Sequence, residues 1–260
     1  MAISIAVASG KGGTGKTTIS ANLAVALSKF GTEVIVLDAD IAMANLELVM
    51  GLDGKSTTLN DVLAGNATIE QAIYEGPAGV KIIPAGISLD AFKKAKPEKL
   101  VEILSALHDM AEIILIDCPA GIGREALTAI STAKHLILVV NPEISSISDA
   151  LKVIAIAKKF DTNILGAIIN RTTMEDSELS SKAIETILEV PILGVVPEDP
   201  NVRRCAAFGE PIVLKYPDSP ASQAILQIAA RLIGKEYKPE KVEKESFIKK
   251  FIKGLFGGIK

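Results

Sequence analysis

Short apolar runs recur along the chain at spacings that leave room for helices between them. Because these runs are continuous rather than alternating with polar residues, they indicate strands buried on both faces, as in a parallel sheet. Helical patterns lie between them, for example over 97–111 and 148–160. The alternation predicts an α/β fold with a doubly wound, mostly parallel sheet, helices on both faces and ligands at the carboxyl ends of the strands. The predicted strands are 3–8, 33–37, 80–84, 112–116, 135–140, 164–169 and 191–196.

The first predicted strand runs directly into a glycine-rich stretch, S-G-K-G-G-T-G-K-T-T, which precedes a helical pattern over 19–30. This stretch fits the P-loop motif G-x-x-x-x-G-K-[ST], and strand, turn and helix are the context that the motif requires. Glycines let backbone N–H groups surround a phosphate, and the helix directs its positive end at the same anion. Lys16 is expected to reach the β- and γ-phosphates, and the Thr17 hydroxyl to ligate Mg²⁺. The residues predicted to contact the nucleotide here are Gly10, Lys11, Gly12, Gly13, Thr14, Gly15, Lys16, Thr17 and Thr18.

Length, charge and cysteine content limit the size of the domain, its binding partners and its cellular compartment. A chain of 260 residues that is 48% apolar suffices for one large α/β domain. Its net charge of −3 argues against a general nucleic-acid-binding surface. The two cysteines, Cys118 and Cys205, form no C-x-x-C pair, so we expect a reduced, cytosolic protein. We expect neither a secretory signal nor an apolar run of the ~20 residues that cross a membrane.

A second lysine, Lys11, begins the same loop, although Lys16 already supplies the cation that a P-loop needs. Together they spell K-G-G-T-G-K-T-T, the deviant Walker A sequence, so the chain resembles the MinD/ParA group of P-loop ATPases. The resemblance implies a P-loop NTPase fold, with ATP or ADP and Mg²⁺ as cofactors. It also implies that Lys11 crosses a dimer interface to the nucleotide of a second copy of the chain.

Acidic residues follow two of the predicted strands at the edge where phosphates should bind. Asp38 and Asp40 follow 33–37, and Asp117 ends the Walker B-like strand, where it can hold Mg²⁺ through water. The segments D-A-D-I-A-M-A-N-L-E and D-C-P-A-G resemble the family's two switch regions. By this resemblance, Asp40 orients the hydrolytic water and Asp38 lies close to the metal; helix N-capping by one aspartate is the alternative. The predicted catalytic residues are thus Lys11, Lys16 and Asp40, and the predicted metal residues are Thr17, Asp38 and Asp117.

Two later strand ends suit the nucleotide base. Asn170 and Arg171 follow 164–169, and an amide there can pair with the donor and acceptor edges of adenine. The P-E-D segment follows 191–196, and both places match the family's adenine site. Asp149 matches an acidic position that the family links to its dimer and partner surface; a carboxylate favoured by the helix dipole is the alternative. The predicted base-binding residues are Asn170, Arg171, Pro197, Glu198 and Asp199.

The composition changes after Gly234. Residues 235–245 are charged and contain a proline, so they read as a solvated linker between an ATPase domain, 1–234, and the last segment, 246–260. On a helical wheel, all apolar side chains of 246–260 fill one half and its four lysines lie on the other. A basic amphipathic helix at a chain end favours interfacial binding to an anionic membrane; docking on the domain or on a partner is the alternative. MinD proteins carry a C-terminal membrane-targeting helix of this type.

The sequence therefore predicts a Mg²⁺-dependent ATP hydrolase of the MinD type that forms an ATP-dependent homodimer. We expect it in the cytoplasm and peripherally on the inner face of the cell membrane, bound through 246–260. The resemblance implies placement of the division site or of another cellular structure, with an activator or effector protein and no DNA as partner. A ParA-like DNA-partitioning ATPase is the alternative. A metal-cluster carrier is disfavoured by the two distant cysteines.

Overall fold

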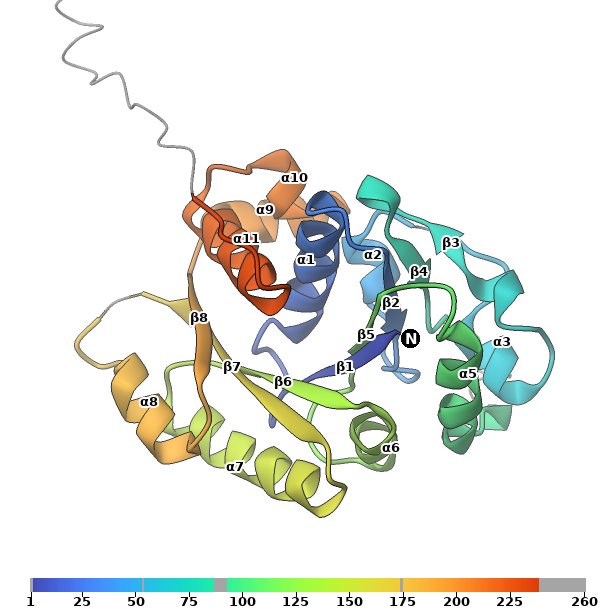
Figure 1. Cartoon of the computed structure of the whole chain (residues 1–260), viewed down its shortest axis with the longest axis horizontal. Helices are drawn as coiled ribbons and strands as arrows, with labels where there is room; N and C mark the ends of the chain where they lie inside the picture. The colour runs from blue at the N-terminus through green and yellow to red at the C-terminus, as the bar shows by residue number, and fades with distance from the viewer. Residues whose placement is uncertain (1, 53, 87–92, 174, 239–260) are drawn as a thin grey trace, which may run out of the picture.

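The computed structural model describes residues 2–52, 54–86, 93–173 and 175–238. Within this part of the chain, eight strands form one sheet in the order β3-β4-β2-β5-β1-β6-β7-β8 (Figure 1). All neighbouring strands are parallel except β3 and β4, which are antiparallel. The predicted fold class is confirmed, and the structure adds the edge strand β3. The strands are β1 Ile3–Ala8, β2 Val34–Asp38, β3 Tyr74–Glu75, β4 Lys81–Ile83, β5 Ile113–Asp117, β6 His135–Val140, β7 Asn163–Thr172 and β8 Ile192–Pro197.

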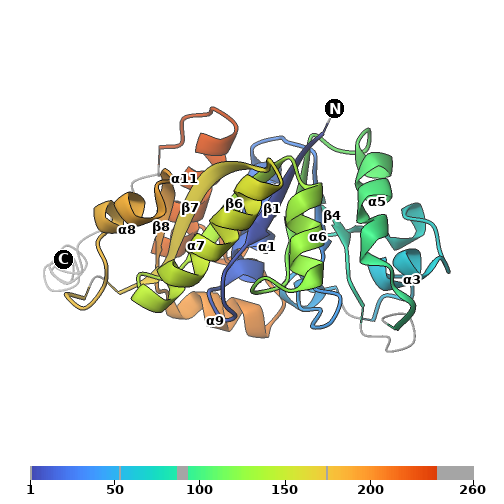
Figure 2. The same cartoon turned by 90° about the horizontal axis from the view of Figure 1, so that it is seen from below.

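Helices cover both faces of this sheet (Figures 1 and 2). Helices α1, α2, α9, α10 and α11 pack on one face, and α3, α5, α6, α7 and α8 pack on the other. Among the described residues the α-helices are α1 Lys16–Lys29, α2 Leu46–Val49, α3 Leu59–Ala64, α5 Leu100–Leu107, α6 Arg124–Thr132, α7 Ile144–Lys159, α8 Ser181–Leu188, α9 Pro200–Ala207, α10 Ile212–Lys215 and α11 Pro220–Leu232. Short 3₁₀ turns occupy Glu70–Ala72, Pro77–Gly79 and Pro97–Lys99.

The sheet separates two hydrophobic cores, because successive side chains of a strand point to opposite faces. In β1, Ile5 and Val7 join the core under α1 and α11, whereas Ala6 and Ala8 join the core under α6 and α7. Both faces of the central strands are thus buried, which explains the continuous apolar runs of the sequence. This burial fixes the carboxyl ends of β1, β2 and β5, where the predicted site residues lie.

Three element bounds differ from the predicted ones at places that matter for the site. Helix α1 begins already at Lys16, so this residue lies in the first turn. Helix α7 begins at Ile144, several residues before the predicted start, so Asp149 lies in its second turn. Strand β7 extends to Thr172, so Asn170 lies within the strand rather than after it. Of these three residues, Lys16 and Asp149 therefore lie near helix starts and Asn170 lies near the end of a strand.

The residues that follow α11 pack against the body. The backbone N–H of Lys235 donates to the carbonyl of Ala230 at 2.8 Å. The ring of Tyr237 meets Phe30 edge to face, with centroids 5.8 Å apart, and its hydroxyl donates to Gln223. The body therefore extends to at least Tyr237, so the first residues of the segment predicted as a linker, 235–245, pack against it. The predicted amphipathic helix over 246–260 lies outside the described residues, and none of the described helices is long and apolar enough to span a membrane.

Candidate nucleotide-binding site

The P-loop joins β1 to α1 at the carboxyl edge of the sheet. Gly13 and Gly15 have φ values of +78° and +86°, left-handed conformations that residues with a Cβ rarely adopt. Gly15 is also the N-cap of α1, and a Cβ on it would lie 2.3 Å from Nδ2 of Asn170. Both glycines are therefore required by the backbone. The structure contains the strand, the glycine-rich loop and the helix N-terminus that the motif requires.

Lys16 lies inside this edge and is only 8% exposed. Its ammonium is 3.5 Å from Oδ1 of Asp117, the fully buried last residue of β5, which also accepts a hydrogen bond from the Ser20 hydroxyl at 2.9 Å. The other oxygen of Asp117, Oδ2, has no hydrogen-bond partner among the described residues. Burial raises the pKa of Asp117, and the charge of Lys16 opposes this shift. A buried carboxylate oxygen without a donor is a ligand for a hard cation, so Asp117 together with the Thr17 hydroxyl fits Mg²⁺.

Asp38, the last residue of β2, is the neighbour of Asp117 across the sheet. Its Oδ1 accepts the backbone N–H of Asp40 at 2.9 Å, and its Oδ2 accepts those of Asn45 and Leu46, both at 3.1 Å. Asp38 thus bonds the first backbone N–H groups of α2 from the end of β2, although the N-cap residue of this helix is Asn45 and not an aspartate. Burial and the charge of Asp117 raise the pKa of Asp38 to about 8. Contact between Asp38 and a metal stays a prediction.

Asp40 lies just beyond β2 and is half-buried, and its Oδ1 accepts the backbone N–H of Met43 at 3.1 Å. Strand β5 lies between β1 and β2 in the sheet. Because all three strands are parallel, their carboxyl ends bring the P-loop, Asp117 and Asp40 to one edge, as the sequence predicts. The water-orienting role of Asp40 stays a prediction.

Lys11 has partners that are separate from those of Lys16. Its ammonium donates to Oε2 of Glu143 at 2.8 Å and to the hydroxyl of Ser145 at 3.0 Å, both at the start of α7. The hydrogen bond and the charge of Lys11 lower the pKa of Glu143. The side chain of Lys11 stays 32% exposed on the rim of the site. Lys16 therefore faces the buried carboxylates, whereas Lys11 faces outward beside α7.

Helix α7 also contacts the beginning of the P-loop. A Cβ on Gly10 would lie 2.3 Å from the backbone carbon of Asp149, so only glycine permits this approach. The carboxylate of Asp149 is paired with Lys152 at 2.8 Å. Asp149 therefore lies beside the P-loop through its backbone, and its predicted part in a dimer surface stays a prediction.

A cavity of about 170 Å³ opens between the P-loop, the end of β7 and the start of α9. Within it, Nδ2 of Asn170 donates to the carbonyl of Thr14 at 2.7 Å, so this amide braces the P-loop. Arg171 has a φ of +62°, which is uncommon for a residue with a side chain. Its guanidinium donates to Oε2 of Glu198 at 2.8 Å and to the carbonyl of Gly13 at 3.3 Å. The residues predicted to bind the base all line this cavity: Asn170, Arg171, Pro197, Glu198 and Asp199.

Two further features of this cavity concern hydrogen bonding. Oδ1 of Asp199 accepts the backbone N–H of Asn201 at 2.9 Å and caps α9, whereas Oδ2 is buried and has no partner among the described residues. Glu198 is held by a second arginine, Arg203, whose guanidinium donates to Oε1 at 3.1 Å. The cavity thus offers a free acceptor and a carboxylate clamped between two cations.

Sequence reasoning missed three residues that hold site residues in place: Ser20, Ser145 and Arg203. The signal for Ser20 was its spacing of three from Thr17, which puts both hydroxyls on the same face of a helix. Ser145 and Arg203 carried no such signal, because their partners are identified only by how α7 and α9 meet the P-loop and β8.

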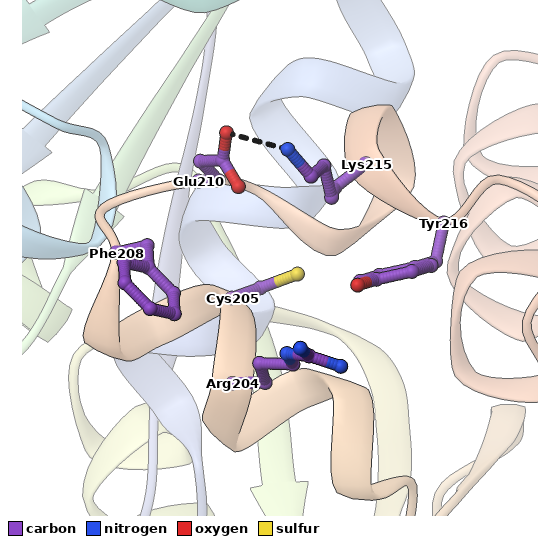
Figure 3. A pocket seen from close by; sticks show the side chains of 6 residues that line it. All are labelled: Arg204, Cys205, Phe208, Glu210, Lys215 and Tyr216. Carbon is purple, nitrogen blue, oxygen red and sulfur yellow. Dashed lines mark hydrogen bonds and ion pairs between the residues drawn. The ribbon is translucent and has the colours of Figure 1, made fainter.

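Neither cysteine joins this site. Cys118 lies in the core under α6 and α7, and burial raises the pKa of its thiol to about 12. Cys205 lies in the core on the other face of the sheet, where burial also raises the pKa of the thiol. Figure 3 shows Cys205 in a second cavity, of about 410 Å³, beside Tyr216 and the ion pair of Glu210 with Lys215. Two neutral thiols on opposite faces of a sheet do not form a shared pair of metal ligands.

The fold and the site together define a class. A central parallel strand leads through a P-loop into a helix, and a buried aspartate ends the adjacent strand, an arrangement that defines a P-loop nucleotide-binding protein. The sequence model of the ParA family, described as a NUBPL iron-transfer P-loop NTPase, matches residues 1–233. An uncharacterised ATP-binding protein of Methanocaldococcus jannaschii is 71% identical over 258 residues, which cover 99% of this chain and 98% of that protein.

Two solved structures are similar over most of their length. The septum site-determining protein MinD of Pyrococcus horikoshii, complexed with Mg-ADP, has a TM-score of 0.86 and 42% identity, and the match covers 89% of this chain and 96% of that one. A MinC:MinD cell division complex from Aquifex aeolicus gives a TM-score of 0.81 and 36% identity, covering 92% and 99%. This chain belongs to the ParA/MinD family of P-loop ATPases.

The raised pKa of Asp38 predicts how stability depends on pH in the absence of nucleotide and metal. The folded state keeps a proton that the unfolded chain releases near pH ~4, so the free energy of unfolding falls as pH rises toward about 8. Asp117→Asn removes the neighbouring charge and lowers the pKa of Asp38, so the fall should become smaller and shift to lower pH. Urea unfolding in EDTA at a series of pH values measures this. Identical curves for the two proteins would contradict the coupling between Asp38 and Asp117.

Proposed function

We propose that this chain is a Mg²⁺-dependent ATPase whose ATP-bound form dimerises and attaches to a membrane surface, as a MinD-type protein does. The observation that carries the proposal is the separation of the two P-loop lysines. Lys16 contacts the buried Asp117, whereas Lys11 lies on the rim with Glu143 and Ser145. Lys16 is thus positioned to bind phosphates in its own chain, and Lys11 is available for a second chain.

The phosphate site carries the hydrolase part of the proposal. The backbone N–H groups of the P-loop and the ammonium of Lys16 bind the β- and γ-phosphates of ATP. The Thr17 hydroxyl and Asp117 hold Mg²⁺, which neutralises charge on the phosphate oxygens when bound. Asp40 accepts a hydrogen bond from the attacking water and orients it. The Mg-ADP described for the Pyrococcus horikoshii relative supports an adenine nucleotide and Mg²⁺ as the molecules that bind here.

The same edge of the sheet suits a second copy of the chain. Three large apolar side chains are exposed in loops or helix starts that follow β2, β5 and β6: Met43 at 71%, Ile122 at 48% and Ile144 at 76%. Exposed apolar residues around a polar site are typical of a surface that is buried in an assembly. Lys11 lies at this edge too, so pairing two copies would bring each Lys11 toward the phosphates of the other.

The last part of the proposal is membrane attachment through residues 246–260. Tyr237 and Phe30 hold the end of the described chain near the C-terminal end of α1. This helix has 14 residues, so its ends are about 21 Å apart, and the described residues end far from the P-loop. A basic amphipathic helix over 246–260 can then bind anionic lipid on the inner face of the cell membrane without covering the nucleotide site. Two such helices on one dimer raise the affinity about 10²–10⁴-fold over one.

The biological role is the positioning of the division site or of another cellular structure, with an activator or effector protein that binds the dimer. The MinC:MinD complex of Aquifex aeolicus supports a protein partner. A ParA-like DNA-partitioning ATPase is the second candidate, because the family model that matches the chain is that of ParA. The net charge of −3 and the lipid-suited segment favour the membrane.

Lys11→Ala should abolish the ATP-dependent dimer and leave nucleotide affinity within about twofold, because the ammonium of Lys11 bonds Glu143 and Ser145 at the rim rather than groups of its own phosphate site. Size-exclusion chromatography with a non-hydrolysable ATP analogue measures the dimer, and a fluorescent ADP measures affinity. Lys159→Ala, an exposed lysine at the other end of α7, is the matched control and should dimerise normally. A normal dimer of the Lys11→Ala variant would refute the cross-interface role.

Deleting 246–260 should abolish ATP-dependent sedimentation with anionic liposomes while nucleotide binding persists. In a second variant, Phe247, Phe251 and Leu255 are all replaced by Ser and every lysine is kept. It should also fail to sediment with the liposomes, because binding requires apolar burial as well as charge. If the full chain with ATP ignores anionic liposomes but shifts DNA in a gel, the DNA-partitioning candidate replaces the membrane one.

A further inference from the structure

Ser20 occupies an unusual position for a serine inside a helix. It lies fully buried in α1, one turn after Thr17 and on the same face. A serine in a helix interior commonly bonds the carbonyl of the preceding turn. Ser20 instead donates across to Oδ1 of Asp117 at 2.9 Å, from the P-loop helix to the end of β5.

Lys16 and Ser20, the two donors to Oδ1 of Asp117, differ in their distance from this oxygen and in charge. The ammonium of Lys16 lies 3.5 Å away, beyond the usual range of about 2.7–3.2 Å for an N–H···O bond. Lys16 is also the side chain that phosphates attract. The Ser20 bond is shorter, its donor is uncharged and it comes from a rigid part of α1, so it persists when Lys16 turns to a nucleotide.

The oxygen that Ser20 leaves free is the one suited to a metal. With Oδ1 bonded to Ser20, the orientation of the Asp117 carboxylate is fixed, and Oδ2 stays buried without a hydrogen-bond partner among the described residues. Without the Ser20 hydroxyl, Oδ1 would keep only the long contact with Lys16, and the orientation of the carboxylate would be less well defined.

We propose that Ser20 is a positioning residue for the Mg²⁺ site: its hydroxyl holds Oδ1 of Asp117 and thereby reserves Oδ2 for the cation or its bound water. The inference rests on the proposed magnesium site formed by Thr17 and Asp117. It adds a buried hydroxyl that touches neither nucleotide nor metal and acts through the carboxylate.

Ser20→Ala should raise the Mg²⁺ concentration that half-saturates binding of a fluorescent ADP by about tenfold, the effect of losing one hydrogen bond to a charged group. The affinity for ADP in EDTA should stay within about twofold of the original protein, because the hydroxyl does not contact the nucleotide. Ser20→Cys keeps the size of the side chain but is a much weaker donor, so it should show the same loss. Ser222→Ala removes a fully buried serine of α11 whose hydroxyl pairs with that of Ser219 and not with Asp117, and it should leave both quantities unchanged.

Different results would refute the role of Ser20 and the magnesium site of Thr17 and Asp117. An unchanged Mg²⁺ requirement in Ser20→Ala and Ser20→Cys, or an equal loss of ADP affinity in EDTA, would overturn the positioning role. If ADP binding by the original protein is indifferent to Mg²⁺, the magnesium site of the proposed function fails, and the inference fails with it.

Discussion

The buried contact of Lys16 with Asp117, beside Asp38, constrains the whole nucleotide edge of the sheet. The two carboxylates are partners on neighbouring strands and are almost fully removed from water. Buried charges are destabilising unless they are paired and hydrogen-bonded. The compensating donors come from α1, through Lys16 and Ser20, and from the segment after β2, whose backbone N–H groups bond Asp38. The hydrogen bonds to these two carboxyl groups therefore fix the P-loop helix and the predicted switch segment together.

This constraint also explains why the loop contains two lysines. Lys16 lies in the interior, at the proposed phosphate and metal site of its own chain. Lys11 stays at the rim and bonds Glu143 and Ser145 at the start of α7, a helix that packs directly on Gly10. In our proposal, occupancy of the phosphate site is coupled to the direction of Lys11 through the few loop residues that join Lys11 to Lys16. Our account of ATP-dependent pairing depends on this short connection.

Much of this arrangement followed from the sequence, because motif and fold support each other. Continuous apolar runs predicted a parallel sheet, and such a sheet brings the carboxyl ends of its strands to one edge, so Asp117 and Asn170 were found as residues at strand ends. The partners of Lys11 were not predictable: Glu143 is 132 residues away, and only the order of strands in the sheet brings them together. Strand β3 is too short for a periodic signal. The packing of Tyr237 on Phe30 was hidden by the charged residues around it.

Sedimentation velocity of the unmodified protein, with Mg-ADP and with Mg²⁺ and a non-hydrolysable ATP analogue, tests the central claim most directly. The account predicts a monomer with Mg-ADP and a dimer with the ATP analogue. In this account Lys11 of each chain exchanges its ion pair with Glu143 for the γ-phosphate bound to the other chain, and ADP has no γ-phosphate. A protein that stays monomeric with both nucleotides, or is dimeric with both, would contradict it.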